Sequence, residues 1–309
     1  MEIRRFLLSE IPTDQIEPLI TDSFFASPGF LNLWRLRGGV GVWWTAWMDK
    51  VLAAVLPGVE FGKGPLRRLY STPNGCYGRL CFVPDIGEHD RKRIASEIMK
   101  AIAGSGYMKV FISDFYKCFE VSGGFRSEQC ETRLVDISEP SWRPAQKKLR
   151  QNISRAEREG IVLERFDGKK HFAGFLKLVR LSEQRIGVRK KYSPEFFRAL
   201  EELSWRDDRI RWVYSEHEEM PMASSIFLVE GDSLLHWHVY FDESLAHLQA
   251  TKYIIFTTAQ QSAADGVRYL NMGASPENAE GVHMFKEKWG GKLFRYNCHF
   301  KKSWLGRMV

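Results

Sequence analysis

The sequence lacks the short motifs that mark several common enzyme classes. No GxSxG, P-loop, HExxH or GxGxxG pattern occurs in the 309 residues. This removes sequence support for an α/β-hydrolase, a P-loop NTPase, a zincin or a dinucleotide-binding domain. The five cysteines are scattered, and none form a CxxC pair. Such spacing favours buried thiols in a reducing compartment over a zinc site or a disulfide framework.

Long apolar runs are also missing. The most apolar window, GGVGVWWTAWM from Gly38, is much shorter than the roughly 20 residues that a membrane-spanning helix needs. In the N-terminal segment MEIRRFLLSE, Glu10 interrupts the apolar stretch, and no small-residue cleavage site follows. We therefore expect no membrane span, no signal peptide and a cytoplasmic location.

The composition is that of a soluble globular protein, with 44% hydrophobic and 27% charged residues. A chain of this length has room for two domains of ordinary size. The net charge of +7 and the pI of about 9.1 favour anionic partners such as nucleotides, tRNA or lipid headgroups. No internal sequence repeat or low-complexity segment is present.

The expected elements follow a similar order in the two halves of the chain. Each half contains helices, an antiparallel set of strands, a long helix and a buried strand. For the first half we expect helices within 9–36, strands at 41–48, 50–57, 76–82, 108–113 and 132–137, and a helix at 90–103. For the second half we expect helices at 170–185, 194–204 and 248–265, and strands at 161–166, 210–216, 222–230 and 233–240. The segment SEPSWRP, from Ser138, reads as the boundary, which gives domains at 1–140 and 141–309.

The stretch from Tyr269 to Phe294 combines several signals of a ligand site. It reads as a strand, a loop with Gly273 and Ser275, a short helix over about 281–289, two glycines and another strand. Lys286 follows the apolar Phe285 and places a cation at the end of a buried strand, where α/β folds usually bind ligands. The alternative is that Phe285 is a core anchor and that Lys286 is a solvated helix charge.

The same stretch resembles the C-terminal signature of the Fem-type peptidoglycan bridge-forming aminoacyl transferases, a branch of the GNAT acyltransferase superfamily. The matching residues are Gly273, Ala274, Phe285, Lys286, Trp289 and Gly290. The resemblance implies an α/β (α+β) fold of two tandem GNAT-like domains. Each domain would be a mixed, mostly antiparallel sheet flanked by helices, with a degenerate first domain and the site in the second. The order of elements resembles the family over nearly the whole chain, whereas the specific motifs lie only in the second half.

In chemical terms, the resemblance implies a transferase that joins an acyl or aminoacyl group to an amine acceptor. Lys286 would stabilise the negative charge that develops on the carbonyl oxygen, and Ser275 and Phe285 would contact the substrate. The donor would be aminoacyl-tRNA or acyl-CoA, with no tightly bound cofactor and no metal. In Fem-type enzymes the acceptor is a peptidoglycan precursor.

A basic helix is expected over KKLRQNISRAEREG. Leu149, Ile153 and Ala156 fall on one face, and the lysines and arginines lie mainly on the other. This pattern resembles the basic opening of the family's second domain. Lys147 and Arg150 are therefore candidate ligands for the phosphates of a nucleotide-linked partner or of tRNA. A solvated helix face is the alternative.

The strand LLHWHVYF supplies further candidates. Strict alternation would place His236, His238 and Tyr240 on one face. If that face lined a cleft, His238 or Tyr240 could move a proton. The alternative is a set of polar residues on a half-exposed strand. No third ligand follows at a spacing typical of a metal site, so we expect no metal.

Two absences bear on the donor and the acceptor. Enzymes of the GNAT superfamily that use acetyl-CoA usually carry a glycine-rich pyrophosphate loop before the long helix. Here no glycine occurs between Gly231 and Gly266, and the acidic pair Asp242-Glu243 precedes the helix. The segment from Arg158 to Pro194 is also too short for the long helical hairpin of some Fem-type enzymes. The other hypotheses are a CoA-dependent N-acyltransferase acting on a small molecule and a non-catalytic module that binds nucleotide or RNA.

Overall fold

The computed structural model describes residues 1–120, 123–187, 191–275, 280–304 and 306. Contacts along the chain divide it into two compact units. The first unit comprises Met1–Cys130 and Arg295–Val309, and the second comprises Glu131–Phe294. This division lies at residue 130, within a strand, whereas the sequence placed a boundary at residue 140. The chain also returns to the first unit at its C-terminal end.

The first unit begins with a strand and two helices, followed by an antiparallel meander. Its elements in chain order are β1 (Glu2–Leu7), α1 (Thr13–Ile20), α2 (Pro28–Leu33), η1 (Trp34–Arg37), β2 (Gly39–Met48), β3 (Val51–Phe61), η2 (Gly64–Leu66), β4 (Arg68–Tyr70), β5 (Cys81–Phe82), α3 (Glu88–Gly104) and β6 (Lys109–Asp114). The strands β7 (Arg126–Asp136) and β13 (Lys292–Lys302) each run from one unit into the other.

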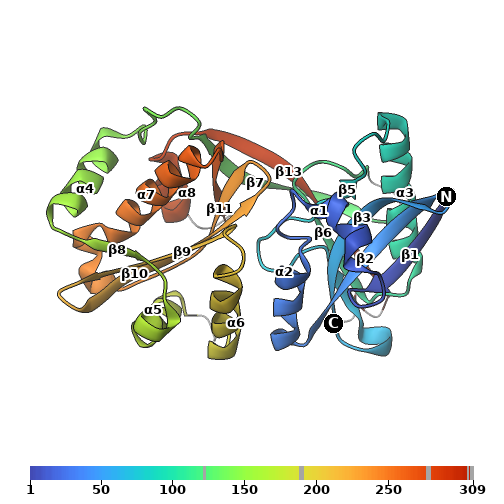
Figure 1. The fold of residues 1–309 in the computed structure, drawn as a ribbon, viewed down its shortest axis with the longest axis horizontal. Helices are drawn as coiled ribbons and strands as arrows, with labels where there is room; N and C mark the ends of the chain where they lie inside the picture. Colours follow the sequence, from blue (N-terminus) through green and yellow to red (C-terminus); the bar gives the residue numbers. More distant parts are fainter. Residues whose placement is uncertain (121–122, 188–190, 276–279, 305, 307–309) are drawn as a thin grey trace. The chain divides into compact units, whose positions relative to one another are not determined.

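The sheet of the first unit has the order β1-β2-β3-β4-β6-β13. Its neighbours are antiparallel except for β4 and β6, which are parallel and are connected through α3. The turn between β2 and β3 has positive φ at Asp49 and Lys50, as a type I′ hairpin requires. The α3 residues Ile94 and Ile98 pack against Val42 and Trp44 of β2, while α1 and α2 cover the opposite face (Figure 1).

The second unit repeats this order of elements. They are α4 (Lys147–Arg158), β8 (Val162–Arg165), α5 (Gly168–Ile186), α6 (Pro194–Ser204), β9 (Ile210–His217), β10 (Met220–Glu230), β11 (Ser233–Phe241), η3 (Glu243–Leu248), α7 (Ala250–Ala264), β12 (Tyr269–Ala274) and α8 (Glu280–Glu287). From β8 to β12 the path is strand, two helices, three-stranded meander, helix and parallel strand. The path from β1 to β6 is the same, so the fold is a tandem of two GNAT-like α/β units.

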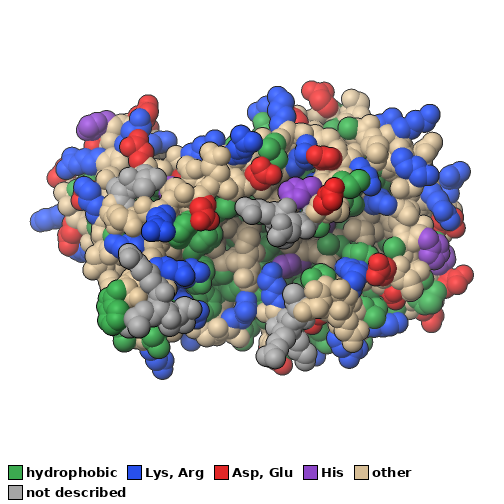
Figure 2. All heavy atoms as spheres, turned by 180° about the vertical axis from the view of Figure 1, so that it is seen from behind, with side chains coloured by type: hydrophobic (Ala, Val, Ile, Leu, Met, Phe, Trp, Pro, Cys, Tyr) green, Lys and Arg blue, Asp and Glu red, His purple; other side chains and the backbone are tan. Residues whose placement is uncertain are grey.

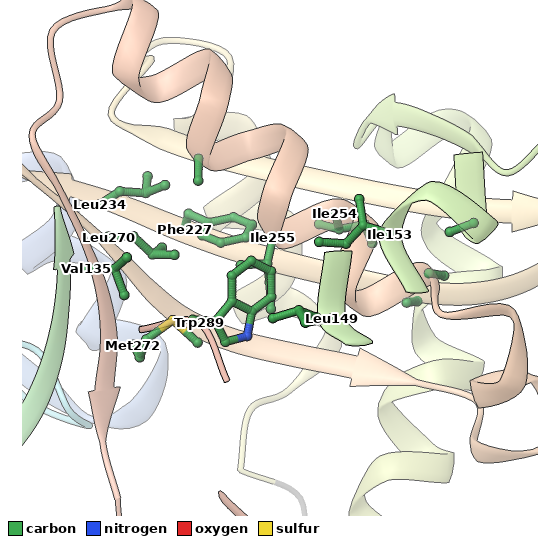
Figure 3. Close-up of a cluster of buried hydrophobic side chains, with 14 of the residues drawn as sticks. Val135, Leu149, Ile153, Phe227, Leu234, Ile254, Ile255, Leu270, Met272 and Trp289 are labelled. Atoms are coloured by element: carbon green, nitrogen blue, oxygen red, sulfur yellow. The ribbon is translucent and has the colours of Figure 1, made fainter. Parts of the chain in front are cut away.

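The sheet of the second unit has the order β8-β9-β10-β11-β12-β7, and only β11 and β12 are parallel. The helices α4, α7 and α8 lie on one face, and α5 and α6 lie on the other (Figure 1). Between α4, α7 and the sheet, Trp289 packs with Leu149, Ile255 and Met272 (Figure 3). Trp289 therefore belongs to the hydrophobic core of the second unit.

Most of the expected elements are present, with three main corrections. The sequence analysis assigned no strand before residue 41, but β1 forms there, and Arg5 donates two hydrogen bonds of 2.8 Å to the buried carboxylate of Glu60. The expected strand over 76–82 shortens to Cys81–Phe82. The strand expected to end at Pro57 continues to Phe61 in β3.

Basic side chains are distributed over the surface. Figure 2 shows lysine and arginine spread among aspartate and glutamate on the face in view, without a single basic patch. Among the residues that the structure describes, no helix is long and apolar enough to cross a membrane.

Candidate active site

The site is built at the C-terminal end of β12. This strand pairs with β11 over only three residues, from Tyr269 to Asn271. On its other side, the register with β7 shifts between Asn271 and Ala274. Gly273 lies in this bulge and has a φ of 74°, a left-handed conformation that glycine adopts without strain. The bulge turns the last backbone carbonyls of β12 away from the regular ladder.

A buried polar network holds this bulge. The Thr132 hydroxyl on β7 lies 2.7 Å from Asn271 Oδ1 and 2.9 Å from the carbonyl oxygen of Gly273. Asn271 Oδ1 also accepts a hydrogen bond of 2.9 Å from the Gly273 N–H. Thr132 and Asn271 are both buried, so these contacts satisfy groups that water does not reach.

Lys286 completes the network from α8. Its Nζ donates to the carbonyl oxygens of Gly273 at 2.6 Å and Ala274 at 3.0 Å, and the residue is only 8% exposed. An ammonium group has three hydrogens to donate. Among the described residues, the structure gives two of them acceptors, which leaves one for a ligand. Lys286 is therefore not the solvated helix charge of the alternative interpretation.

Burial changes the protonation of Lys286. Desolvation lowers its pKa from 10.5 to about 8, because the charged form loses water contacts that two carbonyls only partly replace. A small cavity of about 20 Å³ lies beside it, with Thr132, Arg133, Ser275 and His283 among the lining residues. A cation with a pKa near neutrality can both stabilise an oxyanion and exchange a proton.

The structure brings Ser275 and Lys286, two of the predicted site residues, to the same cavity. Phe285 instead packs at the edge of the hydrophobic core, with its ring 6.3 Å from that of Trp289. The loop after Ser275 lies outside the described residues at 276–279.

A second bulge, in β11, corrects the predicted face of one histidine. His238 pairs with Ile226 and His236 pairs with Phe227, so Trp237 is an extra residue in the strand. His236 therefore points to the opposite face from His238, and it stacks on Phe227 at 4.7 Å between ring centres. Strict alternation was the wrong assumption, because a bulge reverses the orientation of every side chain beyond it.

Of the two histidines of β11, His236 is the one that lies on the side of Lys286. Burial, and then the positive charge of Lys286, lower the pKa of His236 to about 3. Its imidazole is therefore neutral at physiological pH, and it contacts the Ser225 hydroxyl at 3.4 Å. No sequence pattern indicated this proximity, because it depends on the bulge at Trp237.

His238 and Tyr240 lie on the face covered by α5 and α6. His238 Nε2 is 3.0 Å from the Tyr192 hydroxyl, and burial lowers the pKa of His238 well below its ordinary value. Tyr240 packs edge-on against Phe175 and Phe197, and burial raises the pKa of its hydroxyl. The structure thus groups these two residues together but does not place them beside Lys286.

The predicted basic helix forms as α4, with Leu149, Ile153 and Ala156 buried. Lys147 and Arg150 are exposed. Arg150 Nη1 donates to the carbonyl oxygens of Pro144 at 2.8 Å and Ala145 at 2.7 Å, so part of its guanidinium group fixes the start of the helix. Backbone bonds from Ala145 to Trp289 and from Gln146 to Lys288 join this helix start to the end of α8.

Near the start of α7, the charges of two other lysines, from α4 and from the end of α8, act on Lys252. The pKa of Lys252 is lowered first by burial and then by the charges of Lys288 and Lys148. Lys252 also donates to the side chain of Gln249, which precedes α7. Sequence reasoning missed Lys252 and Lys288 as members of a cluster, because the residues are far apart along the chain.

The acidic pair before α7 does not occupy the start of that helix. Asp242 instead accepts hydrogen bonds from the Ser244 N–H at 3.0 Å and the Ser244 hydroxyl at 2.6 Å, and so caps η3. Within the described ranges, no group of three or more His, Cys, Asp and Glu side chains is placed to hold a metal ion.

Comparison with known families agrees with this geometry. Residues 143–287 match the model of a family described as "Acetyltransferase (GNAT) domain". This range begins before α4 and ends with Glu287, so it contains Lys286 and most of the second unit. No curated protein sequence matches the chain.

Solved structures with the same fold cover almost the whole chain. A crystal structure of FemX has a TM-score of 0.69 at 11% identity, covering 96% of this chain and 97% of its own. The C-terminal domain of a putative lysylphosphatidylglycerol synthetase from Agrobacterium fabrum has a TM-score of 0.62 at 14% identity, covering 96% and 94%. A tandem GNAT protein from the clavulanic acid biosynthesis pathway has a TM-score of 0.53 at 10% identity, covering 97% and 98%.

These likenesses concern the fold. Residues 143–287 therefore match a GNAT acetyltransferase domain, and the chain shares its fold with FemX and with the lysylphosphatidylglycerol synthetase domain.

Proposed function

We propose that this chain transfers an acyl or aminoacyl group to an amine acceptor and forms an amide. The observation that carries the proposal is the position of Lys286. It is a buried ammonium group at the bulged end of β12, with acceptors for two of its three hydrogens among the described residues and with Ser275 lining the same cavity. The family match and the fold likeness to FemX support the same class of reaction.

The chemistry follows from the charge that develops during amide formation. The amine nitrogen attacks the carbonyl carbon of a thioester or an aminoacyl ester, and negative charge builds on the carbonyl oxygen. The Lys286 ammonium stabilises this oxyanion in a site with little water, where such contacts are strong. The intermediate then expels a thiolate or the ribose oxygen of tRNA, and the proton that the amine loses passes to this leaving group. His238 and Tyr240, the residues predicted to move a proton, lie on the other face of β11, away from Lys286.

The lysine cluster supports a donor that carries phosphate. Lys252 lies in the first turn of α7, and the charges of Lys148 and Lys288 act on it. The N-terminus of a helix also favours anions. Lys147 and Arg150 extend this basic region along α4. We favour aminoacyl-tRNA as the donor, a cytoplasmic reaction and a cell-wall precursor as the acceptor, in line with the likeness to FemX. The segment before α7 has no glycine-rich loop for coenzyme A.

A coenzyme A donor is the second candidate. It is favoured by the family description and by the likeness to a tandem GNAT protein whose structure is described as "without AcCoA". A nucleotide- or RNA-binding module without catalysis is the third. It would bind anions through the same lysines but would release no product.

Donor identity is tested by thermal unfolding of the purified chain with acetyl-CoA, with aminoacyl-tRNA and with uncharged tRNA. A ligand at 100 times its Kd stabilises a protein by about 2.7 kcal/mol. We expect stabilisation with charged tRNA, a loss of the effect in Lys252→Ala and no effect of acetyl-CoA. Stabilisation by acetyl-CoA alone would favour the second candidate. Equal stabilisation by charged and uncharged tRNA, with no amide product, would favour the binding module.

A further inference from the structure

The first unit contains a chain of hydrogen bonds from an exposed serine to a buried carboxylate. Ser127 Oγ, near the start of β7, lies 2.5 Å from His299 Nδ1 on β13. The other ring nitrogen of His299, Nε2, lies 3.3 Å from Asp114 Oδ2 at the end of β6. His299 and Asp114 are both 0% exposed, whereas Ser127 is exposed.

The sheet register explains how these groups meet. His299 pairs with Ile112 on the antiparallel strand β6, and Asp114 is two residues further along that strand. Side chains two residues apart lie on the same face, so the carboxylate is a diagonal neighbour of the imidazole.

The partners of each group show which atom donates and which accepts in these hydrogen bonds. Asp114 Oδ1 accepts the Cys118 N–H at 2.7 Å, and Asp114 Oδ2 accepts the Phe119 N–H at 3.0 Å. Asp114 is thus an acceptor, and His299 Nε2–H donates to it. The Nδ1 atom then has a free lone pair, which accepts the hydroxyl hydrogen of Ser127. The same three groups occur where a histidine activates a serine and a carboxylate orients the histidine, although the two ring nitrogens exchange roles here.

Another histidine of the chain shows what a purely structural pair looks like. His171 Nε2 is 2.8 Å from the Glu164 carboxylate, but its Nδ1 accepts the backbone N–H of Asp167 at 3.0 Å. Both ring nitrogens of His171 are therefore used within the fold. His299 differs because its second nitrogen meets a hydroxyl that solvent can reach.

We propose that Ser127 is a nucleophile that accepts acyl groups from small activated esters or thioesters. Ser127 Oγ attacks the carbonyl carbon, and its proton passes to His299 Nδ1. The bond from the carbonyl carbon to the leaving oxygen or sulfur breaks, the leaving group takes that proton, and an acyl ester of Ser127 forms. Water then attacks this ester with the same proton path, which releases a carboxylic acid and restores the serine. Asp114 keeps its charge throughout and balances the imidazolium.

The direct test uses the full-length chain and a fluorophosphonate probe, which forms an oxygen–phosphorus bond and releases fluoride. Ser138 is the internal control, because it is also exposed and its hydroxyl donates to Asp136 at 2.6 Å without a histidine. Peptide mass spectrometry should find the adduct on Ser127 and at least tenfold less on Ser138. No adduct on Ser127, or equal labelling of the two serines, would overturn the proposal.

Substitutions of Ser127, His299 and Asp114 test this series of hydrogen bonds, which we call the Ser127–His299–Asp114 relay. Ser127→Ala should abolish the labelling and the hydrolysis of p-nitrophenyl acetate above background, while Ser138→Ala should change neither. His299→Gln and Asp114→Asn should slow the labelling of Ser127 at least tenfold, since general-base assistance contributes about 10²-fold or more. Unchanged labelling in a folded His299→Gln protein would contradict the relay.

If that variant does not fold, the wild-type comparison of Ser127 with Ser138 decides. Ser127→Ala should leave amide formation in the second unit unchanged, so the two proposals fail separately.

Discussion

The protonation of Lys286 is the residue-scale property on which the proposed transfer depends most. Two carbonyl oxygens hold the Nζ atom, and desolvation brings its pKa to about 8. Above that pH the ammonium becomes an amine and no longer stabilises an oxyanion. In Lys286→Arg the guanidinium stays charged at all accessible pH values, so this variant is the matched control.

We therefore expect the ratio of the wild-type transfer rate to the Lys286→Arg rate to fall as pH rises through about 8. Taking the ratio cancels the effect of pH on the acceptor amine, which is common to both proteins. Transfer rates measured between pH 6.5 and 9.5 test this expectation. A constant ratio over the whole range would show that the charge of Lys286 does not govern the rate.

The same shift of the Lys286 pKa affects stability. The folded pKa, about 8, lies below the ordinary value of 10.5, so between these values the unfolded chain binds more protons. The free energy of unfolding should then rise as pH increases from about 8 to 10.5. The stability gained from the neutral Lys286 amine is lost again as pH falls back to 8. Lys286→Met should remove this part of the slope. Urea unfolding at several pH values checks it, and an identical slope in both proteins would contradict the assigned burial.

Thr132 allows a test of the network around the bulge. Thr132→Val removes the hydroxyl that contacts Asn271 and the Gly273 carbonyl, so each of these two buried oxygens keeps one hydrogen bond fewer. We expect a loss of about 0.5–1.5 kcal/mol in the free energy of unfolding. Thr132→Ser keeps the hydroxyl and should lose less. Equal losses in the two variants would mean that the methyl group, not the hydrogen bonds, matters at this site.

At the scale of elements, the turn from α8 to β13 shows why the motif carries two glycines. Gly291 has a φ of 87°, and a Cβ atom there would lie 2.3 Å from the carbonyl oxygen of Leu134. Gly291→Ala should therefore destabilise the protein by about 2 kcal/mol or more. Gly281, in α8, is the control, since no described atom lies within 4 Å of its Cβ position. Gly281→Ala should change stability by less than about 1 kcal/mol. Thermal unfolding of both variants tests the pair, and equal effects would contradict this account of the turn.

The sequence predicted most elements of the second unit because their local signals agree. Ser193 caps α6 by accepting the Phe196 N–H at 3.3 Å, and Pro194 follows it at the first helical position. Positive φ at Glu218 and Glu219 forms the expected turn between β9 and β10. The strand β1 was missed because its Arg4-Arg5 pair hides the strand pattern, and only the distant Glu60 explains a part-buried arginine there.

The candidate site was predictable only in part. Lys286 and Ser275 belong to one continuous motif, so the sequence could place them together at a strand end. The orientation of His236 depends on a bulge that pairs β11 with β10, and the lysine cluster combines α4, α7 and the end of α8. Such long-range pairings leave no local pattern in the chain.

At the scale of the whole molecule, the two units share one order of elements but carry different polar groups. The first unit holds the Ser127–His299–Asp114 relay, and the second holds Lys286 and the lysine cluster. The proposed transfer uses the second unit.

Charge reversal of the cluster by Lys252→Glu should weaken donor binding at least tenfold and reduce its salt dependence. Lys177→Glu, on α5, is the control for net charge. Binding titrations at several salt concentrations test this, and equal weakening by both substitutions would argue against a specific donor site.

The most direct test of the account is to measure amide formation by mass spectrometry, with aminoacyl-tRNA or acyl-CoA as the donor and a panel of amine acceptors that includes cell-wall precursors. We predict an amide product whose rate of formation falls about 10²-fold or more in Lys286→Met, while the Kd of the donor changes less than threefold. An undiminished rate in Lys286→Met, or no amide with either donor although the donor binds, would contradict the assignment of this chain as a Lys286-dependent acyl transferase.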